Sequence, residues 1–137
     1  MKLQPDRADV PTISGHGLGW LAVDGEKIFH SVVIATHGQR LAWDCTSFQA
    51  LDASHFAQLA QFDAEVVIFG SGDRIRFPQP AWLAPLMARR IGLETMDTAA
   101  ACRTYNILAG EGRKVVLAAL IEGNAQDTRI ETGFKVK

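Results

Sequence analysis

Residues 66–72 read VVIFGSG, a short apolar run that ends in two glycines around a serine. A continuous apolar run of this length is typical of a strand buried on both faces of an α/β sheet. Strands are also predicted at residues 93–96 and 115–121, and helical patterns lie between these three runs. The alternation of helix and strand predicts an α/β fold. Residues 115–121, VVLAALI, are the most apolar of the three and are predicted to form the central strand.

Two helices are predicted around the first of these strands. Asp52 can cap a short helix, since an aspartate side chain accepts a hydrogen bond from the first turn. The next helix is predicted to begin near Trp82, because Pro85 is tolerated only in a first turn. Its core stripe includes Met87, and Gly92 is predicted to be its C-terminal cap.

The first third of the chain has the pattern of a β-meander. Asp-Gly at residues 24–25 predicts a two-residue hairpin turn between strands at 18–23 and 26–35. A further strand is predicted at 40–43. Residues 15–19, GHGLG, place glycines at alternate positions, which suits a strand that is bent or closely approached by other backbone.

Composition indicates one ordinary globular domain. The chain has 137 residues, of which 47% are hydrophobic and 21% charged. A chain of this length buries roughly two thirds of its unfolded surface. We predict a flexible N-terminus at 1–9, a single α/β domain at 10–123 and a loosely held C-terminal tail at 124–137, since the last stretch shows no apolar periodicity.

Charge and hydropathy narrow the class of protein. The formal net charge is −1, and nucleic-acid binding normally requires clustered lysine and arginine, so we expect no nucleic-acid partner. The longest apolar run is far shorter than the ~20 residues that a membrane-spanning helix needs. Residues 1–10 lack the apolar run of a secretory signal, and two cysteines are too few for a disulfide framework. We therefore expect a cytoplasmic protein that does not span a membrane.

A candidate site lies where two predicted parallel strands end. The first ends at Gly70-Ser71-Gly72 and the second at Asp97-Thr98, each before a helical segment. In open α/β sheets, ligands bind in the crevice beyond such carboxyl ends. The N-terminus of a helix there favours an anion, but Asp97 can occupy the same N–H groups and would repel it. The same glycines also suit a tight strand exit without any ligand.

Three further candidate residues lie on the predicted helix at 98–109. Cys102 near a helix start could be a reactive thiol. We favour a buried structural residue, because no second cysteine or histidine lies near it in the sequence. Arg103 lies opposite the core stripe, where it could bind a partner's carboxylate or pair internally with Asp97 or Glu111. Asn106 is predicted to bond loop backbone.

Metal and catalytic patterns are missing from the sequence. The four histidines show no HxxxH or HExxH spacing, and no serine has a GxSxG context. We therefore expect no metal, no cofactor and no catalytic residues.

A family resemblance emerges from the same region. Residues 96–108, MDTAAACRTYNIL, followed by EGR at 111–113, resemble the signature of the complex I assembly factor 3 family, which also contains uncharacterised bacterial and archaeal proteins. ISGHG at 13–17, Trp43 and GSG at 70–72 match further family blocks. The resemblance implies a three-layer fold, in which a central mixed sheet has helices on one side and β-structure with a helix on the other. For the mitochondrial members it implies contacts with another assembly factor and with early subunits of complex I.

Three hypotheses for function follow. The first is a non-enzymatic assembly or interaction module with a protein partner, such as a membrane-complex subunit or an assembly factor. The second is a small-ligand-binding domain that uses the crevice between Gly72 and Thr98. The third and weakest is a thiol-dependent enzyme centred on Cys102. An exposed apolar patch away from the crevice would favour the first, a closed polar pocket the second, and an accessible low-pKa thiol the third.

Overall fold

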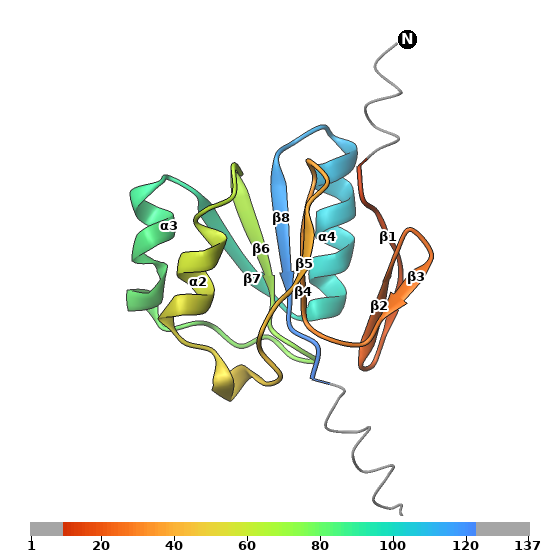
Figure 1. Cartoon of the computed structure of the whole chain (residues 1–137), viewed down its shortest axis with the longest axis horizontal. Coiled ribbons are helices and arrows are strands. Elements are labelled where there is room, and N and C mark those ends of the chain that lie inside the picture. The colour runs from red at the N-terminus through yellow and green to blue at the C-terminus, as the bar shows by residue number, and fades with distance from the viewer. Residues whose placement is uncertain (1–9, 123–137) are drawn as a thin grey trace, which may run out of the picture.

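The computed structural model describes residues 10–122 as one α/β domain (Figure 1). The strands are β1 (Ile13–Gly17), β2 (Trp20–Val23), β3 (Glu26–Ile28), β4 (Val32–Ala35), β5 (Arg40–Ala42), β6 (Val66–Gly70), β7 (Gly92–Met96) and β8 (Val115–Ala119). The α-helices are α2 (Ala53–Leu59), α3 (Ala84–Ala88) and α4 (Thr98–Gly110), and the 3₁₀ helices are η1 (Phe48–Ala50) and η2 (Pro80–Leu83). The predicted N-terminus at 1–9 and tail at 124–137 lie outside the described residues.

The five-stranded central sheet is mixed, with the order β5-β4-β8-β6-β7. Strand β6 is parallel to β7 and β8, whereas β4 is antiparallel to β5 and β8. The predicted central position of 115–121 is confirmed, because β8 lies in the middle of this order. Both β6 and β8 are buried along their whole length, as their continuous apolar sequences predicted.

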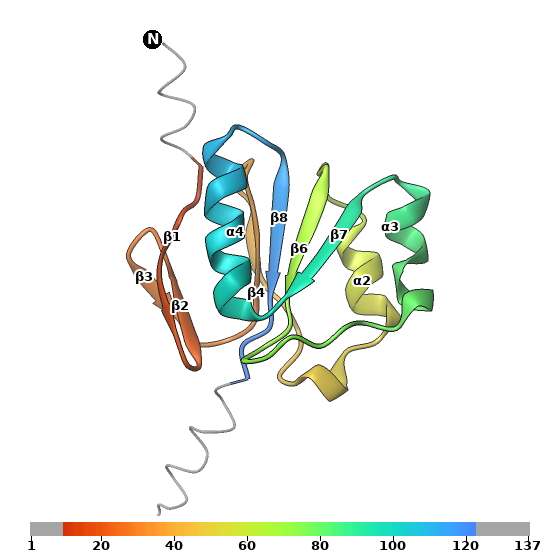
Figure 2. The same cartoon turned by 180° about the vertical axis from the view of Figure 1, so that it is seen from behind.

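Two apolar clusters on opposite faces of the central sheet make the domain three-layered. Val115, Leu117 and Ala119 of β8 face α4 and the small β1-β2-β3 sheet. Val116 and Ala118 face α2 and α3, since successive strand residues point to opposite faces. Figures 1 and 2 show α2 and α3 covering one face and α4 lying beside β1–β3 on the other. The implied arrangement of layers is confirmed.

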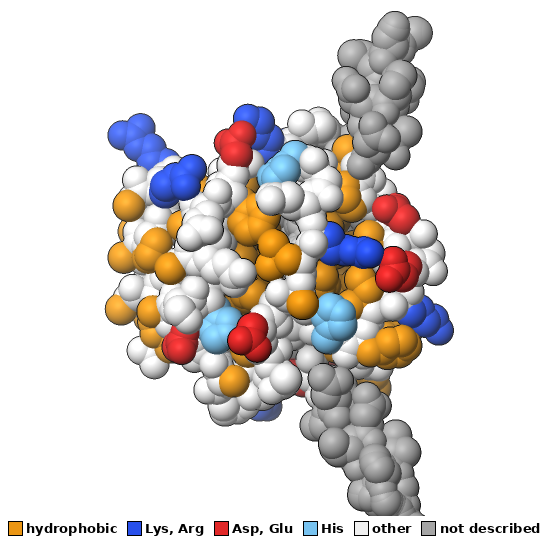
Figure 3. Space-filling view, in the orientation of Figure 1, with side chains coloured by type: hydrophobic (Ala, Val, Ile, Leu, Met, Phe, Trp, Pro, Cys, Tyr) orange, Lys and Arg blue, Asp and Glu red, His pale blue; other side chains and the backbone are white. Residues whose placement is uncertain are grey.

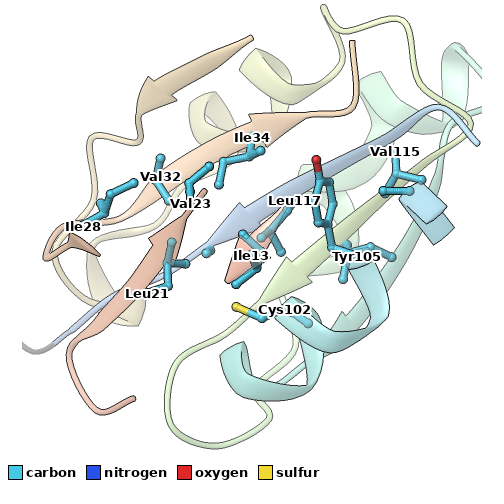
Figure 4. Close-up of a cluster of buried hydrophobic side chains, with 14 of the residues drawn as sticks. Ile13, Leu21, Val23, Ile28, Val32, Ile34, Cys102, Tyr105, Val115 and Leu117 are labelled. Carbon is cyan, nitrogen blue, oxygen red and sulfur yellow. The ribbon is translucent and has the colours of Figure 1, made fainter. Parts of the chain in front are cut away.

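The small sheet is attached to α4 by hydrogen bonds. The hydroxyl of Tyr105 donates to the carbonyl of Pro11 at 2.8 Å. The amide of Asn106 accepts from the N–H of Ile13 and donates to the carbonyl of Ile13, both at 2.9 Å. Figure 4 shows Tyr105 and Ile13 meeting in the core between the two layers. The prediction that Asn106 bonds backbone is correct, and the backbone it holds begins β1.

The bend predicted for the glycine-rich strand is present in β1. Its register with β2 shifts between Ile13 and Gly15. The group that approaches this strand closely is the indole of Trp20, not backbone as the sequence suggested. A Cβ on Gly17 would overlap the Trp20 ring nitrogen. Glycine at position 17 therefore lets a large side chain cross the strand.

The strand predicted at 26–35 is two strands. Strand β3 ends at Ile28 in the small sheet and β4 begins at Val32 in the central sheet. Buried Ser31 sits between them, where its hydroxyl accepts from the N–H of Ile121 at 2.8 Å. Nothing in a run of β-formers marks the point at which a chain leaves one sheet for another.

The predictions for the helix between β6 and β7 are partly wrong. The 3₁₀ turn η2 precedes α3, and Pro85 lies in the first turn of α3 as expected. Met87 is 70% exposed and does not belong to the core. Gly92 begins β7, and the turn after α3 is made instead by Arg90, whose φ is 58°. The helix is shorter than its pattern suggested because the chain must turn early to enter β7.

Gly70 is predicted to be indispensable for packing α4 against β6. A Cβ at this position would lie 2.9 Å from the Cα of Thr98 and 3.1 Å from the Cβ of Ala101. We expect Gly70→Ala to lower the free energy of unfolding by about 1–3 kcal/mol, the usual cost of overpacking. Gly110→Ala is the control, because its Cβ meets nothing within 4 Å, and it should be neutral or stabilising by up to about 1 kcal/mol. Equal effects of the two variants in urea unfolding would contradict this account.

Candidate functional site

A pocket of about 340 Å³ lies at the carboxyl ends of β6 and β8. Four segments line it: residues 16–19 at the end of β1 and in the turn to β2, 72–73 after β6, 97–99 at the start of α4, and 120–122 after β8. Its volume lies within the roughly 300–1,000 Å³ range of small-molecule sites. The structure thus has a pocket at the crevice predicted between Gly72 and Thr98, and four separate segments form it.

Thr98 holds three of these segments together. Its hydroxyl accepts from the N–H of Gly72 and donates to the carbonyl of Leu120, both at 2.9 Å. The N–H of Thr98 also donates to the carbonyl of Gly72 at 2.8 Å. The donor and one acceptor position of this hydroxyl are therefore committed to the wall of the pocket.

The start of α4 has few N–H groups left for a ligand. Gly72 accepts from Thr98, and a carboxylate oxygen of Asp97 accepts from Ala100 at 2.8 Å. Within residues 10–122, only Ala99 of the first three helical residues donates its N–H to no acceptor. Because Asp97 also adds a negative charge, this helix start does not favour an anion.

An ion pair closes the back of the pocket. Arg76 donates to the carboxylate of Glu122 at 2.5 Å and to the carbonyl of Ser71 at 2.6 Å. The other oxygen of Glu122 accepts from the N–H of Phe48 at 2.7 Å, and the guanidinium lies 4.8 Å from the centre of the Phe48 ring. A Cβ on Gly72 would overlap both charged groups. The glycine therefore makes room for the pair.

Of the eight candidate residues, the pocket brings together Gly72, Asp97 and Thr98. Gly70 and Ser71 lie behind its wall. The buried hydroxyl of Ser71 accepts from the N–H of Arg76 at 2.8 Å and lies 2.9 Å from the carbonyl of Arg74. This hydroxyl shapes the loop after β6 and does not line the pocket.

Cys102 is part of the core. It is fully buried, and Figure 4 shows its sulfur among the side chains of Ile13 and Leu21. Burial raises the pKa of the Cys102 thiol to about 12, and the nearby charge of Arg103 lowers it only in part. A thiol in this environment stays protonated near neutral pH, so the geometry gives no support to a thiol-dependent enzyme.

Arg103 and Asn106 also lie outside the pocket lining. Arg103 is exposed, and within residues 10–122 it forms no ion pair with Asp97, Glu111 or any other carboxylate. The internal pairing considered from the sequence is therefore not observed. Asn106 is used to hold β1, as described above.

The sequence did not identify the β1–β2 turn or Glu122 as parts of the site. The alternate glycines at residues 15–19 signalled an unusual strand, but their position over the start of α4 depends on how the two sheets pack. Glu122 follows the most apolar strand and had no motif around it. Among residues 10–122, no group of three histidine, cysteine or acidic side chains could hold a metal ion.

The same fold occurs in solved bacterial structures. A protein from Bordetella parapertussis is 36% identical, with a TM-score of 0.77 over 82% of this chain and 96% of that one. A Bordetella pertussis protein described as a Mth938-like domain is 32% identical, with a TM-score of 0.71 over 82% and 86% of the two chains. The fold is thus that of a small Mth938-like α/β domain.

Sequence relatives define the family. Residues 13–121 match the family described as a protein of unknown function (DUF498/DUF598), and the chain belongs to this family. NADH dehydrogenase [ubiquinone] 1 alpha subcomplex assembly factor 3 of Homo sapiens is 31% identical over 87% of this chain and 65% of its own length. The Bos taurus protein of the same name is 34% identical over 72% and 54%. The chain thus spans between half and two thirds of these relatives. The resemblance read from residues 96–113 is confirmed.

The Arg76–Glu122 pair is predicted to contribute measurably to stability. Both side chains are largely buried, at 17% and 25% exposure, so Arg76→Ala would leave the Glu122 carboxylate without its cation. We expect a loss of about 1–3 kcal/mol in the free energy of unfolding. Arg113→Ala is the matched control, because the Arg113–Glu65 pair is 43% and 49% exposed and should cost at most about 1 kcal/mol. Indistinguishable urea midpoints for the two variants would contradict the prediction.

Cys102 is predicted to react slowly with iodoacetamide at pH 7.5 in the folded protein and quickly in urea, because only the thiolate is nucleophilic.

The raised pKa of Cys102 also makes the free energy of unfolding depend on pH. The contribution is complete below the ordinary value of 9.0 and is lost as pH rises from there towards 12, since the unfolded thiol ionises first. Cys102→Ala should weaken this alkaline dependence. Rapid alkylation of the folded protein, measured by mass spectrometry in a Cys45→Ala background, would contradict the prediction.

Proposed function

We propose that this chain is a non-enzymatic interaction module that assists the assembly of a multisubunit complex of the respiratory complex I type. The observation that carries the proposal is the similarity to complex I assembly factor 3 proteins over most of the described domain. A protein partner is implied by that role, either a subunit of the membrane complex or another assembly factor. Across residues 10–122, no helix is long and apolar enough to cross a membrane.

Exposed apolar side chains support the proposal. Contiguous apolar patches at a protein surface often mark sites that contact partners. Figure 3 shows hydrophobic side chains reaching the surface over α3 and over the small sheet. Within residues 10–122, the large hydrophobic residues with at least half of their surface exposed are Leu18, Phe29, Ile75, Phe77, Met87 and Ile107.

The proposal is tested by affinity capture and by deletion. The tagged chain, purified from the organism that encodes it, should enrich subunits or assembly factors of one membrane complex when compared with an unrelated tagged domain of similar size. Deletion of the gene should lower the amount of that complex on a native gel, and re-expression should restore it. Unchanged complex levels in the deletion strain, together with no enriched subunit, would refute the role.

Arg103 is predicted to serve an external partner. Its side chain is exposed and makes no ion pair within residues 10–122, so Arg103→Ala should change the free energy of unfolding by no more than about 0.5 kcal/mol. Partner recovery in the capture experiment should nevertheless fall. Arg113→Ala, beyond the other end of α4, provides the control for loss of one surface cation. A strongly destabilised Arg103→Ala protein would show that the residue acts inside the fold.

A further inference from the structure

Among residues 10–122, the acidic charges around the pocket are not balanced by lysine or arginine. Asp73, Asp97 and Glu122 line the pocket, and no described lysine or arginine does. Glu122 is neutralised by Arg76 behind the wall. Within residues 10–122, neither Asp73 nor Asp97 forms an ion pair. Two carboxylates of the lining therefore have no cation of their own.

The lining also offers an apolar side chain to an occupant. Leu120 and Ile121 form part of the lining but are only 1% and 3% exposed, so they present very little surface. Leu18 belongs to the same lining but is 80% exposed, so it has almost no contact with the rest of the domain. An occupant that covers Leu18 and reaches the carboxylates must combine an apolar part with a positive charge.

An anionic or neutral acceptor ligand fits the pocket poorly. The hydroxyl and N–H of Thr98 are both engaged by the wall, and the N–H of Ala100 is taken by Asp97. The lining groups with free capacity are the carboxylates of Asp73 and Asp97, which only accept hydrogen bonds, together with the imidazole of His16 and the N–H of Ala99. The pocket is therefore suited to a hydrogen-bond donor that carries positive charge.

We propose that this pocket receives a lysine or arginine side chain of a protein partner. Both side chains have an apolar stem that can lie along Leu18 and a charged end that can reach Asp73 and Asp97. The inference rests on the proposed function, because it takes the source of the basic side chain to be the protein partner that an assembly role requires. It names the chemistry by which that partner is recognised.

The inference is tested with small probes that carry only this chemistry. In ¹⁵N-resolved NMR titrations, N-acetyl-lysine N-methylamide and N-acetyl-arginine N-methylamide should saturably shift the amide signals of residues 16–19, 72–73 and 97–99. The uncharged analogues built on norleucine and citrulline should bind more weakly. Raising the salt concentration should weaken binding of the charged probes, because the carboxylates are partly exposed.

Charge-removing variants identify the groups responsible. Asp73→Asn with Asp97→Asn removes both charges, and asparagine still caps the helix at position 97. The double variant should bind the charged probes about threefold to tenfold more weakly, as expected for two partly exposed ion pairs. Glu111→Gln is the matched control, since it removes one exposed carboxylate just beyond the other end of α4, and it should leave binding unchanged.

Three results would overturn the inference. The first is equal shifts with the norleucine and lysine probes, and the second is unaltered affinity in the double variant. The third is tighter binding of the free diamine cadaverine than of the acetylated lysine probe, which would indicate a small metabolite in place of a protein side chain. Capture from cells separates this inference from the proposed function. If the wild type and the double variant recover the same complex subunits in equal amounts, the inference fails while the assembly role stands.

Discussion

The close approach of α4 to β6 is the constraint on which the rest of the domain depends. Gly70 has no side chain, so the backbone of Thr98 can lie directly over the end of β6. At that distance the Thr98 hydroxyl reaches both Gly72 and Leu120 and joins three chain segments. A larger residue at position 70 would push the helix outward and break these bonds together. The pocket exists because one glycine lets one threonine act as a connector.

The same helix also positions the fourth wall of the pocket. Its buried residues pack on the central sheet, while Tyr105 and Asn106 bind the backbone of Pro11 and Ile13. These bonds fix the start of β1, and the hairpin that follows carries residues 16–19 over the beginning of α4. One helix thus serves as a core element, as the attachment site of the small sheet and as a wall of the pocket.

Electrostatics within the pocket follow from which charges the fold neutralises. Arg76 is held by the carbonyl of Ser71 and by Glu122, so the loop after β6 and the exit of β8 are joined through a largely buried pair. The chain provides no such partner for Asp73 or Asp97 among residues 10–122. A fold that neutralises one carboxylate and leaves two neighbours free is arranged to accept positive charge from outside. Burial keeps Cys102 protonated, so it adds no charge near neutral pH.

The sequence by itself determined the α/β class, the central place of residues 115–121, the parallel strands that end just before Ser71 and Asp97, and the helix predicted at residues 98–109. Each of these rests on a local pattern, either a continuous apolar run or a helical period with its cap. Only the tertiary structure decided that residues 26–35 divide between two sheets, that Met87 is exposed, and that the β1–β2 turn joins the pocket. These features depend on which distant segments pack together. A short-range sequence pattern does not determine that packing, because the same β-forming or helical residues can pack against several different segments of the chain.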